Sequence, residues 1–150
     1  MMITDRLSAA VAAFLAQSAL PGDPNVVTQI DITENTEESA RVIVVAGSSE
    51  LRKPSLPGNY DILGEVTIFK TIDEQDGTED LVQEFQDLCD AVEELIGMKY
   101  DMIPILHGID PKLQLYSWNL TGQASMMQER AMGAKFSWAA FARQDNDNPN

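Results

Sequence analysis

The feature that most constrains the fold is the stretch Thr78–Ile96, which places apolar residues on one face of a helix and carboxylates on the other. The apolar residues recur at spacings of four and three, at Leu81, Phe85, Leu88, Val92 and Leu95. This periodicity predicts an amphipathic helix, and Gly97 is placed to end it. A stripe this wide is typical of a helix that packs on a sheet rather than on one partner helix.

Acidic residues crowd this helix and the segment before it. Between Lys70 and Lys99 there is no basic residue, whereas ten carboxylates occur there: Asp73, Glu74, Asp76, Glu79, Asp80, Glu84, Asp87, Asp90, Glu93 and Glu94. The helix therefore lacks internal i, i+4 ion pairs, and its neighbouring carboxylates repel each other by roughly a few tenths of a kcal/mol per pair. Asp76 and Glu79 resemble a capping box, which offsets part of that repulsion at the helix N-terminus.

The whole chain is acidic, with a net charge of −14. Sequence-specific binding of nucleic acid usually needs a basic patch that neutralises phosphates, so we expect most of this surface to repel DNA. Acidity on this scale has two interpretations. It keeps a protein soluble, and it also suits the wall of a channel through which DNA slides without being gripped.

Two strand-like segments are predicted on each side of the acidic helix. Residues 41–46 are β-branched and residues 65–69 alternate in polarity, so we expect an antiparallel pair. Residues 113–120 and 133–142 are predicted strands after the helix, and a shift in the apolar pattern of the first indicates a bulge or burial on both faces. The last strand has four residues on one face: Phe136, Trp138, Ala140 and Ala142.

A helix over residues 3–18 begins the chain, and a candidate short strand covers residues 26–32. The expected order of main elements is α-β-β-α-β-β. This is an α+β fold, with an antiparallel sheet of about four strands flanked by two main helices. The length of 150 residues and the 44% hydrophobic content suffice for one core. We therefore expect a single α+β domain over residues 1–142 and a mobile C-terminal tail over residues 143–150.

Two long connections are candidate contact regions. Residues 47–58 form a predicted loop that contains Arg52 and Lys53, the only adjacent basic pair in the chain. Residues 122–132 form a predicted methionine-rich link, whose composition is typical of an exposed or interface-forming segment. Both are longer than a tight hairpin turn, which favours a role as contact arms.

No motif for catalysis, cofactor binding or metal binding emerges from the sequence. Cys89 falls inside the apolar stripe and is expected to act as a small buried residue. His107 lies in residues 100–109, which are predicted to form a turn with a partly buried histidine, because Pro104 interrupts any long helix. One imidazole without a second ligand is a poor metal site, and no serine with a positioned base is present. We therefore expect no catalytic, cofactor or metal residues, and no enzyme.

Membrane insertion and secretion are also disfavoured. No apolar run approaches the roughly 18 to 20 residues that cross a bilayer. The N-terminal residues lack the basic start and long apolar core of a secretory signal, and they are expected to be mature structure. A single cysteine forms no internal disulfide, which is consistent with a reducing cytoplasm.

Over nearly its whole length, the chain resembles the tail terminator, or tail completion, proteins of long-tailed bacteriophages. The resemblance rests on the N-terminal helix, the strand at 41–46 with its long loop, the segment 60–71, the amphipathic helix Thr78–Ile96 and the two late strands. It implies a curved antiparallel sheet flanked by helices. It further implies a structural virion protein that forms a six-membered ring, caps the tail tube and joins the tail to the head connector.

The same resemblance implies the partners and the location. The partners would be further copies of the chain, the tail tube protein and a head-side connector or stopper protein, while genome DNA passes through the lumen without specific binding. The protein would lie in the virion at the head–tail interface after assembly in the host cytoplasm. From their length and composition, we further expect the loop containing Arg52 and Lys53 and the link at 123–133 to contact adjacent subunits or the tube.

Three other classes of protein are alternatives to a tail terminator. A head-side neck protein, either a connector or a head-closure ring, shares the size and the assembly behaviour. An acidic tail-assembly chaperone would share the charge but would be absent from finished particles. An enzyme is disfavoured because convergent titratable residues of different types are missing.

Overall fold

The computed structural model describes most of the chain, namely residues 3–21, 24–28, 40–51, 59–71, 78–98, 101–128 and 131–144. These residues form three helices and five strands in the order α1 (Ile3–Gln17), β1 (Asn25–Thr28), β2 (Ala40–Leu51), β3 (Asn59–Thr71), α2 (Thr78–Ile96), α3 (Met102–Ile109), β4 (Leu113–Gln128) and β5 (Ala131–Gln144). The fold is therefore α+β, as the sequence predicts.

The strands form one five-stranded sheet in the order β1-β2-β3-β5-β4. β2 pairs with β3, β3 with β5 and β5 with β4, all antiparallel, whereas the short β1 runs parallel to β2. The predicted antiparallel pairing of 41–46 with 65–69 is confirmed. The expectation of about four strands left out β1, which covers the first part of the candidate segment 26–32.

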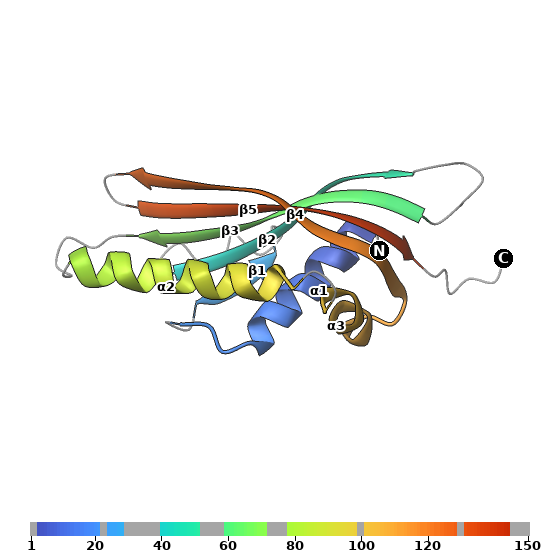
Figure 1. Ribbon diagram of the computed structural model, residues 1–150, viewed down its shortest axis with the longest axis horizontal. Helices are drawn as coiled ribbons and strands as arrows, with labels where there is room; N and C mark the ends of the chain where they lie inside the picture. Colours follow the sequence, from blue (N-terminus) through green and yellow to red (C-terminus); the bar gives the residue numbers. More distant parts are fainter. Residues whose placement is uncertain are drawn as a thin grey trace.

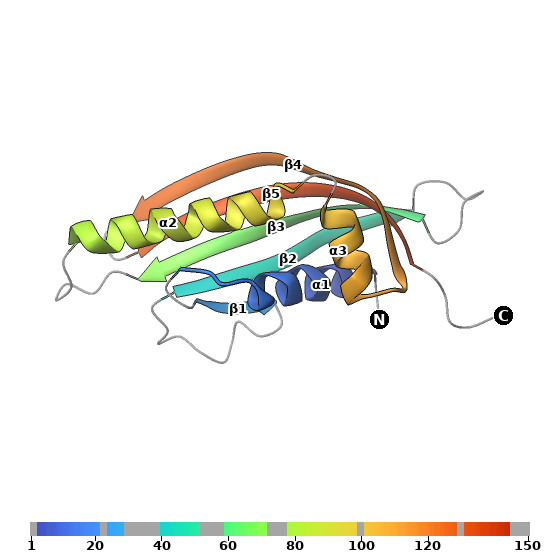
Figure 2. The ribbon, with the colours of Figure 1, turned by 60° about the horizontal axis from the view of Figure 1, so that its bottom comes forward.

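All three helices lie on one face of the sheet (Figure 1). α1 runs along β1 and β2, and α3 lies beside α1 at one end of the sheet, whereas α2 covers the other end of β3, β5 and β4 (Figure 2). Among the described residues no helix covers the opposite face, which includes three large exposed side chains: Leu63, Phe69 and Tyr116. Tyr116 lies against Phe141 there, with ring centroids 5.3 Å apart.

Two stacked tryptophans form the centre of the core. The rings of Trp118 on β4 and Trp138 on β5 are 4.7 Å apart, and the Trp118 indole Nε1 donates a 2.6 Å hydrogen bond to the carbonyl oxygen of Ile96 at the end of α2. Gly64 on β3 pairs in register with Trp138, and a Cβ at this glycine would overlap the indole ring. The absence of a side chain at Gly64 therefore allows Trp138 to lie across β3.

Several predicted elements are confirmed. The acidic helix has the expected bounds, Thr78–Ile96, and the first helix ends one residue before the expected position. The shift in the apolar pattern of β4 corresponds to register shifts between Leu115 and Ser117 and between Leu120 and Gly122. The expected face of β5 is buried at all four positions: Phe136, Trp138, Ala140 and Ala142.

The prediction of a turn over residues 100–109 is wrong, because α3 occupies Met102–Ile109. Pro104 is tolerated because it lies in the first helical turn, where a backbone N–H would lack an intrahelical acceptor. Met102 and Leu106 are one turn apart and fully buried, so tertiary packing stabilises this short helix. His107 lies on its exposed side rather than partly buried.

The strands extend further than the sequence predicts. The segment 122–128, expected to be part of a link, continues β4, and β5 begins at Ala131. Residues 47–51, expected to begin a loop, belong to β2, and Arg143 and Gln144, expected in a mobile tail, belong to β5. These extensions occur because long partner strands supply hydrogen bonds across the sheet, which weak local propensity does not reveal.

Candidate functional site

The amphipathic pattern of α2 gives the helix one buried and one charged face. Phe85, Leu88, Val92 and Ile96 are buried against the sheet. Five carboxylate side chains are exposed: Glu84, Asp87, Asp90, Glu93 and Glu94. Since the helix contains no Lys or Arg, this face presents negative charge along the described part of its length.

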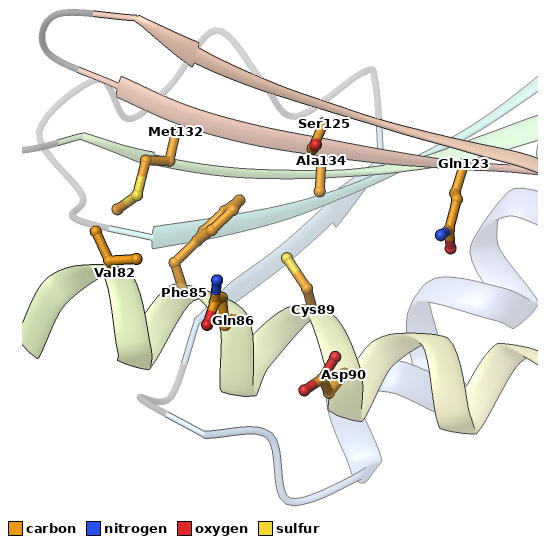
Figure 3. A pocket seen from close by; sticks show the side chains of 9 residues that line it. All are labelled: Val82, Phe85, Gln86, Cys89, Asp90, Gln123, Ser125, Met132 and Ala134. Carbon is orange, nitrogen blue, oxygen red and sulfur yellow. The ribbon is translucent and has the colours of Figure 1, made fainter.

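One cation from the sheet reaches the helix. The Nζ atom of Lys70, at the end of β3, lies 2.8 Å from the Glu84 Oε2 atom. The Lys70 side chain is 11% exposed and that of Glu84 is 61% exposed, so the pair joins a mostly buried ammonium to a solvated carboxylate. This ion pair connects α2 to β3. Gln86 and Asp90 lie on the other side of α2, which faces β4 (Figure 3).

A groove of about 570 Å³ lies between the middle of α2, residues 82–90, and the β4–β5 hairpin (Figure 3). Its apolar lining comes from both layers: Val82, Phe85 and Cys89 on α2, with Met132 and Ala134 on β5. Its polar lining comprises Gln86, Asp90, Gln123 and Ser125. The groove therefore combines an apolar interior with a rim whose one charged group is a carboxylate.

Cys89 lies half-buried in this groove as a free thiol. Burial raises the pKa of this thiol from its ordinary value of 9.0 to about 11, and the nearby charges of Asp90 and Glu93 contribute in the same direction. The thiol therefore stays protonated at neutral pH and is a poor nucleophile. The expectation that Cys89 is buried is met only in part, because the side chain packs against the core on one side and lines the groove on the other.

His107 contacts a backbone carbonyl group. Its Nδ1 atom lies 3.1 Å from the carbonyl oxygen of Leu113, which accepts a hydrogen bond when that nitrogen carries the proton. Within the described ranges, no group of three or more His, Cys, Asp or Glu side chains converges as a metal site. None of the helices built from those residues is both long and apolar enough to cross a membrane.

The predicted contact residues divide into two groups. Arg52 and Lys53, and the acidic segment 73–77 that precedes α2, lie outside the described residues. The link at 122–132 is instead largely the paired end of the β4–β5 hairpin, and its residues Gln123, Ser125 and Met132 line the groove.

Sequence reasoning missed this groove and the part of β4 that borders it, residues 122–128. The sequence does contain one indication of the longer strand. The sixteen residues of β4 include no charged side chain, although the chain has 34 charged residues, 24 acidic and 10 basic. No model of a protein family matches the chain, and no curated protein matches it.

Proposed function

We propose that this protein is a structural virion protein that forms a six-membered ring, caps the tail tube of a long-tailed bacteriophage and joins the tail to the head connector. The observation that carries the proposal is the exposed carboxylate face of α2, on a helix without any basic residue. Fixed negative charge repels phosphate, so a ring lined by such helices lets DNA pass without binding it.

The order of the main elements supports the same class of protein. α1, β2, β3, α2, β4 and β5 follow the α-β-β-α-β-β order expected of a tail terminator, with β1 and α3 added. The sheet face without helices exposes Leu63, Phe69 and Tyr116, which are suitable for burial against neighbouring subunits. Contacts of this kind would stabilise a small domain within a closed ring.

The role of the acidic face is tested by charge neutralisation. A variant carrying Asp87→Asn, Glu93→Gln and Glu94→Gln should still form rings but should reduce the passage of DNA through joined particles. Glu65→Gln is the control, because Glu65 pairs with Lys135 on the opposite side of the sheet from α2, with an Oε1–Nζ distance of 2.8 Å. Unchanged DNA passage in the triple variant would count against a lumen lined by α2.

Loss of the protein from an infecting phage distinguishes the related classes. A tail terminator predicts extra-long tails, because nothing stops tube growth. Tails of normal length beside heads that leak DNA would instead indicate a head-side neck protein. Absence of the chain from purified finished particles would indicate an assembly chaperone.

The predicted contact arm remains a separate hypothesis. Arg52→Glu together with Lys53→Glu should weaken ring formation or tail capping, because the pair is the only adjacent basic pair in an acidic chain. Intact rings and normal capping in this variant would reject the assignment of the 47–58 segment to subunit or tube contacts.

A further inference from the structure

The strand β4 is an edge of the sheet, since it pairs only with β5 in the described strand order. Exposed edges offer unpaired backbone groups, and proteins usually blunt them with charged side chains, proline or bulges. β4 has no charged residue and no proline. Its two bulges lie before Gly122, and from Gly122 to Gln128 the pairing with β5 runs without a shift. This half of the edge therefore lacks the usual protection.

The open edge and the groove meet at the same place. Gln123 and Ser125 belong to the unprotected half of β4 and are exposed. Both line the groove between α2 and the sheet (Figure 3). A strand added beside β4 would project alternate side chains toward the same face as Gln123 and Ser125. Those side chains would enter the groove near Phe85 and Cys89, where apolar surface is still accessible.

Charge restricts which segment can occupy this position. The groove carries one carboxylate, Asp90, and the α2 face beside it continues with the exposed carboxylate of Glu93. A second copy of this chain would bring another acidic α2 and a further net charge of −14. A segment with Lys or Arg among its groove-facing residues would instead complement Asp90 and Glu93.

We propose that residues 122–128 of β4 accept an extended, basic segment of a partner protein as an additional strand. Its central groove-facing side chain is small and apolar and fills the space between the sheet and Phe85 and Cys89, while a flanking groove-facing side chain is Lys or Arg near Asp90. The paired length is about 23 Å at roughly 3.3 Å per residue. This docking does not require the proposed ring, and it is measured by different readouts.

A synthetic heptapeptide supplies the probe, with the sequence Thr-Lys-Thr-Val-Thr-Lys-Thr, which places Lys, Val and Lys opposite residues 123, 125 and 127 of β4. Cys89 is the only cysteine of the chain and lies in the groove, so its rate of alkylation reports occupancy when it is measured at about pH 9, where a small fraction of the thiol is ionised. Saturating peptide should slow alkylation by about tenfold, and hydrogen exchange should slow in residues 122–128. A peptide with Glu in place of both Lys residues should have neither effect.

Two matched variants test whether the bound peptide occupies the groove side of β4. Ser125→Lys places a positive charge inside the groove, whereas Ala124→Lys places the same charge on the adjacent, opposite-facing residue. Both residues are exposed, so both variants should fold with unchanged circular dichroism. Ser125→Lys should weaken peptide binding by about tenfold, and Ala124→Lys by less than about threefold.

A second pair tests the charge complementarity. Asp90→Asn should weaken binding by about fivefold and reduce its salt dependence, because it removes the carboxylate in the groove. Glu94→Gln removes an exposed carboxylate of the same helix that does not line the groove and should change binding by less than about twofold.

Three results would overturn the proposal. The first is unchanged Cys89 alkylation at peptide concentrations that reach the solubility limit. The second is equal binding of the basic and acidic peptides, or equal effects of Ser125→Lys and Ala124→Lys. The third is a dimer in sedimentation that Ser125→Lys abolishes, because a second copy would then occupy the edge. None of these results bears on the ring proposal, which is tested separately.

Discussion

The two halves of α2 are packed differently against the same sheet. In the C-terminal half, Val92 and Ile96 are completely buried, and the carbonyl oxygen of Ile96 accepts the hydrogen bond from Trp118. Over residues 82–90, by contrast, Val82 and Cys89 are only partly buried, and a groove of about 570 Å³ separates the helix from the hairpin. One helix thus contributes both to a filled core and to an open surface.

The difference originates in the strand opposite the helix. Where α2 ends, the sheet presents two tryptophan rings, whose volume fills the space between the layers. Near Phe85 the edge strand instead presents Gln123 and Ser125, which favour contact with water and leave the space unfilled. A helix face with uniform apolar periodicity is therefore no guarantee of uniform burial, because the partner surface decides how much of it is covered.

The filled half should be the more sensitive to added volume, and Gly64 gives the largest expected effect. Gly64→Ala should reduce the free energy of unfolding by about 3 kcal/mol, because the new Cβ overlaps the Trp138 ring. Gly133→Ala is the matched control, since a Cβ there would lie 3.8 Å from its nearest neighbour, the Ile68 carbonyl oxygen. It should change stability by less than about 1 kcal/mol. Denaturant unfolding measures both, and equal losses would contradict the assigned clash.

Removing the hydrogen bond at the end of α2 should have the next largest effect. Trp118→Phe should destabilise the protein by about 2 kcal/mol, because it removes both ring area and the indole donor to the Ile96 carbonyl. Tyr116→Phe, on the exposed face of the same strand, should cost less than about 0.5 kcal/mol. If thermal unfolding gave similar losses for both, the Trp118 contact would not anchor the filled half.

Two alanines on β5 compare the filled core with the groove. Ala142 is fully buried, so Ala142→Val should destabilise by about 1 to 3 kcal/mol through overpacking. Ala134 lines the groove, so Ala134→Val should be neutral or stabilise by up to about 1 kcal/mol, because the added methyl groups fill available space. Denaturant unfolding of both variants measures the difference. A loss at Ala134 as large as that at Ala142 would show that the groove is already filled.

The effect of Cys89 is seen only at alkaline pH. The pKa of its thiol is raised to about 11 in the folded protein from an ordinary value of 9.0. The unfolded chain therefore ionises first, so the contribution of this thiol to stability is full below about pH 9 and is lost as the pH rises to about 11. Unfolding free energies from pH 7 to pH 10.5 should fall more steeply for the wild type than for Cys89→Ala. Parallel curves would indicate an unperturbed, solvated thiol.

Much of the fold was predictable from local patterns. The period of α2, the β-branched run of β2 and the alternating burial in β5 each depend on residues close in sequence, and all three elements were predicted. α3 was not, because Pro104 argues against a helix unless it lies in the first turn, and the burial of Met102 and Leu106 comes from distant parts of the chain.

The groove was less accessible to sequence reasoning for a related reason. Met126 and Met127 indicated an interface, but their segment was assigned to a connection, so Gln123 and Ser125 were not expected to face α2. Their neighbours follow from the register of β4 against β5, which has two bulges that each reverse the facing of the residues beyond. Local propensity does not give the number of such shifts.

The most direct test of the proposed function is the symmetry of the assembled protein. Purified protein at high concentration, and the same protein mixed with tail tubes, would be imaged by negative-stain electron microscopy and sorted by rotational symmetry. The account predicts six-fold rings, seated at one end of the tubes when tubes are present. Twelve-fold rings, or tubes whose ends remain bare at saturating protein, would contradict it.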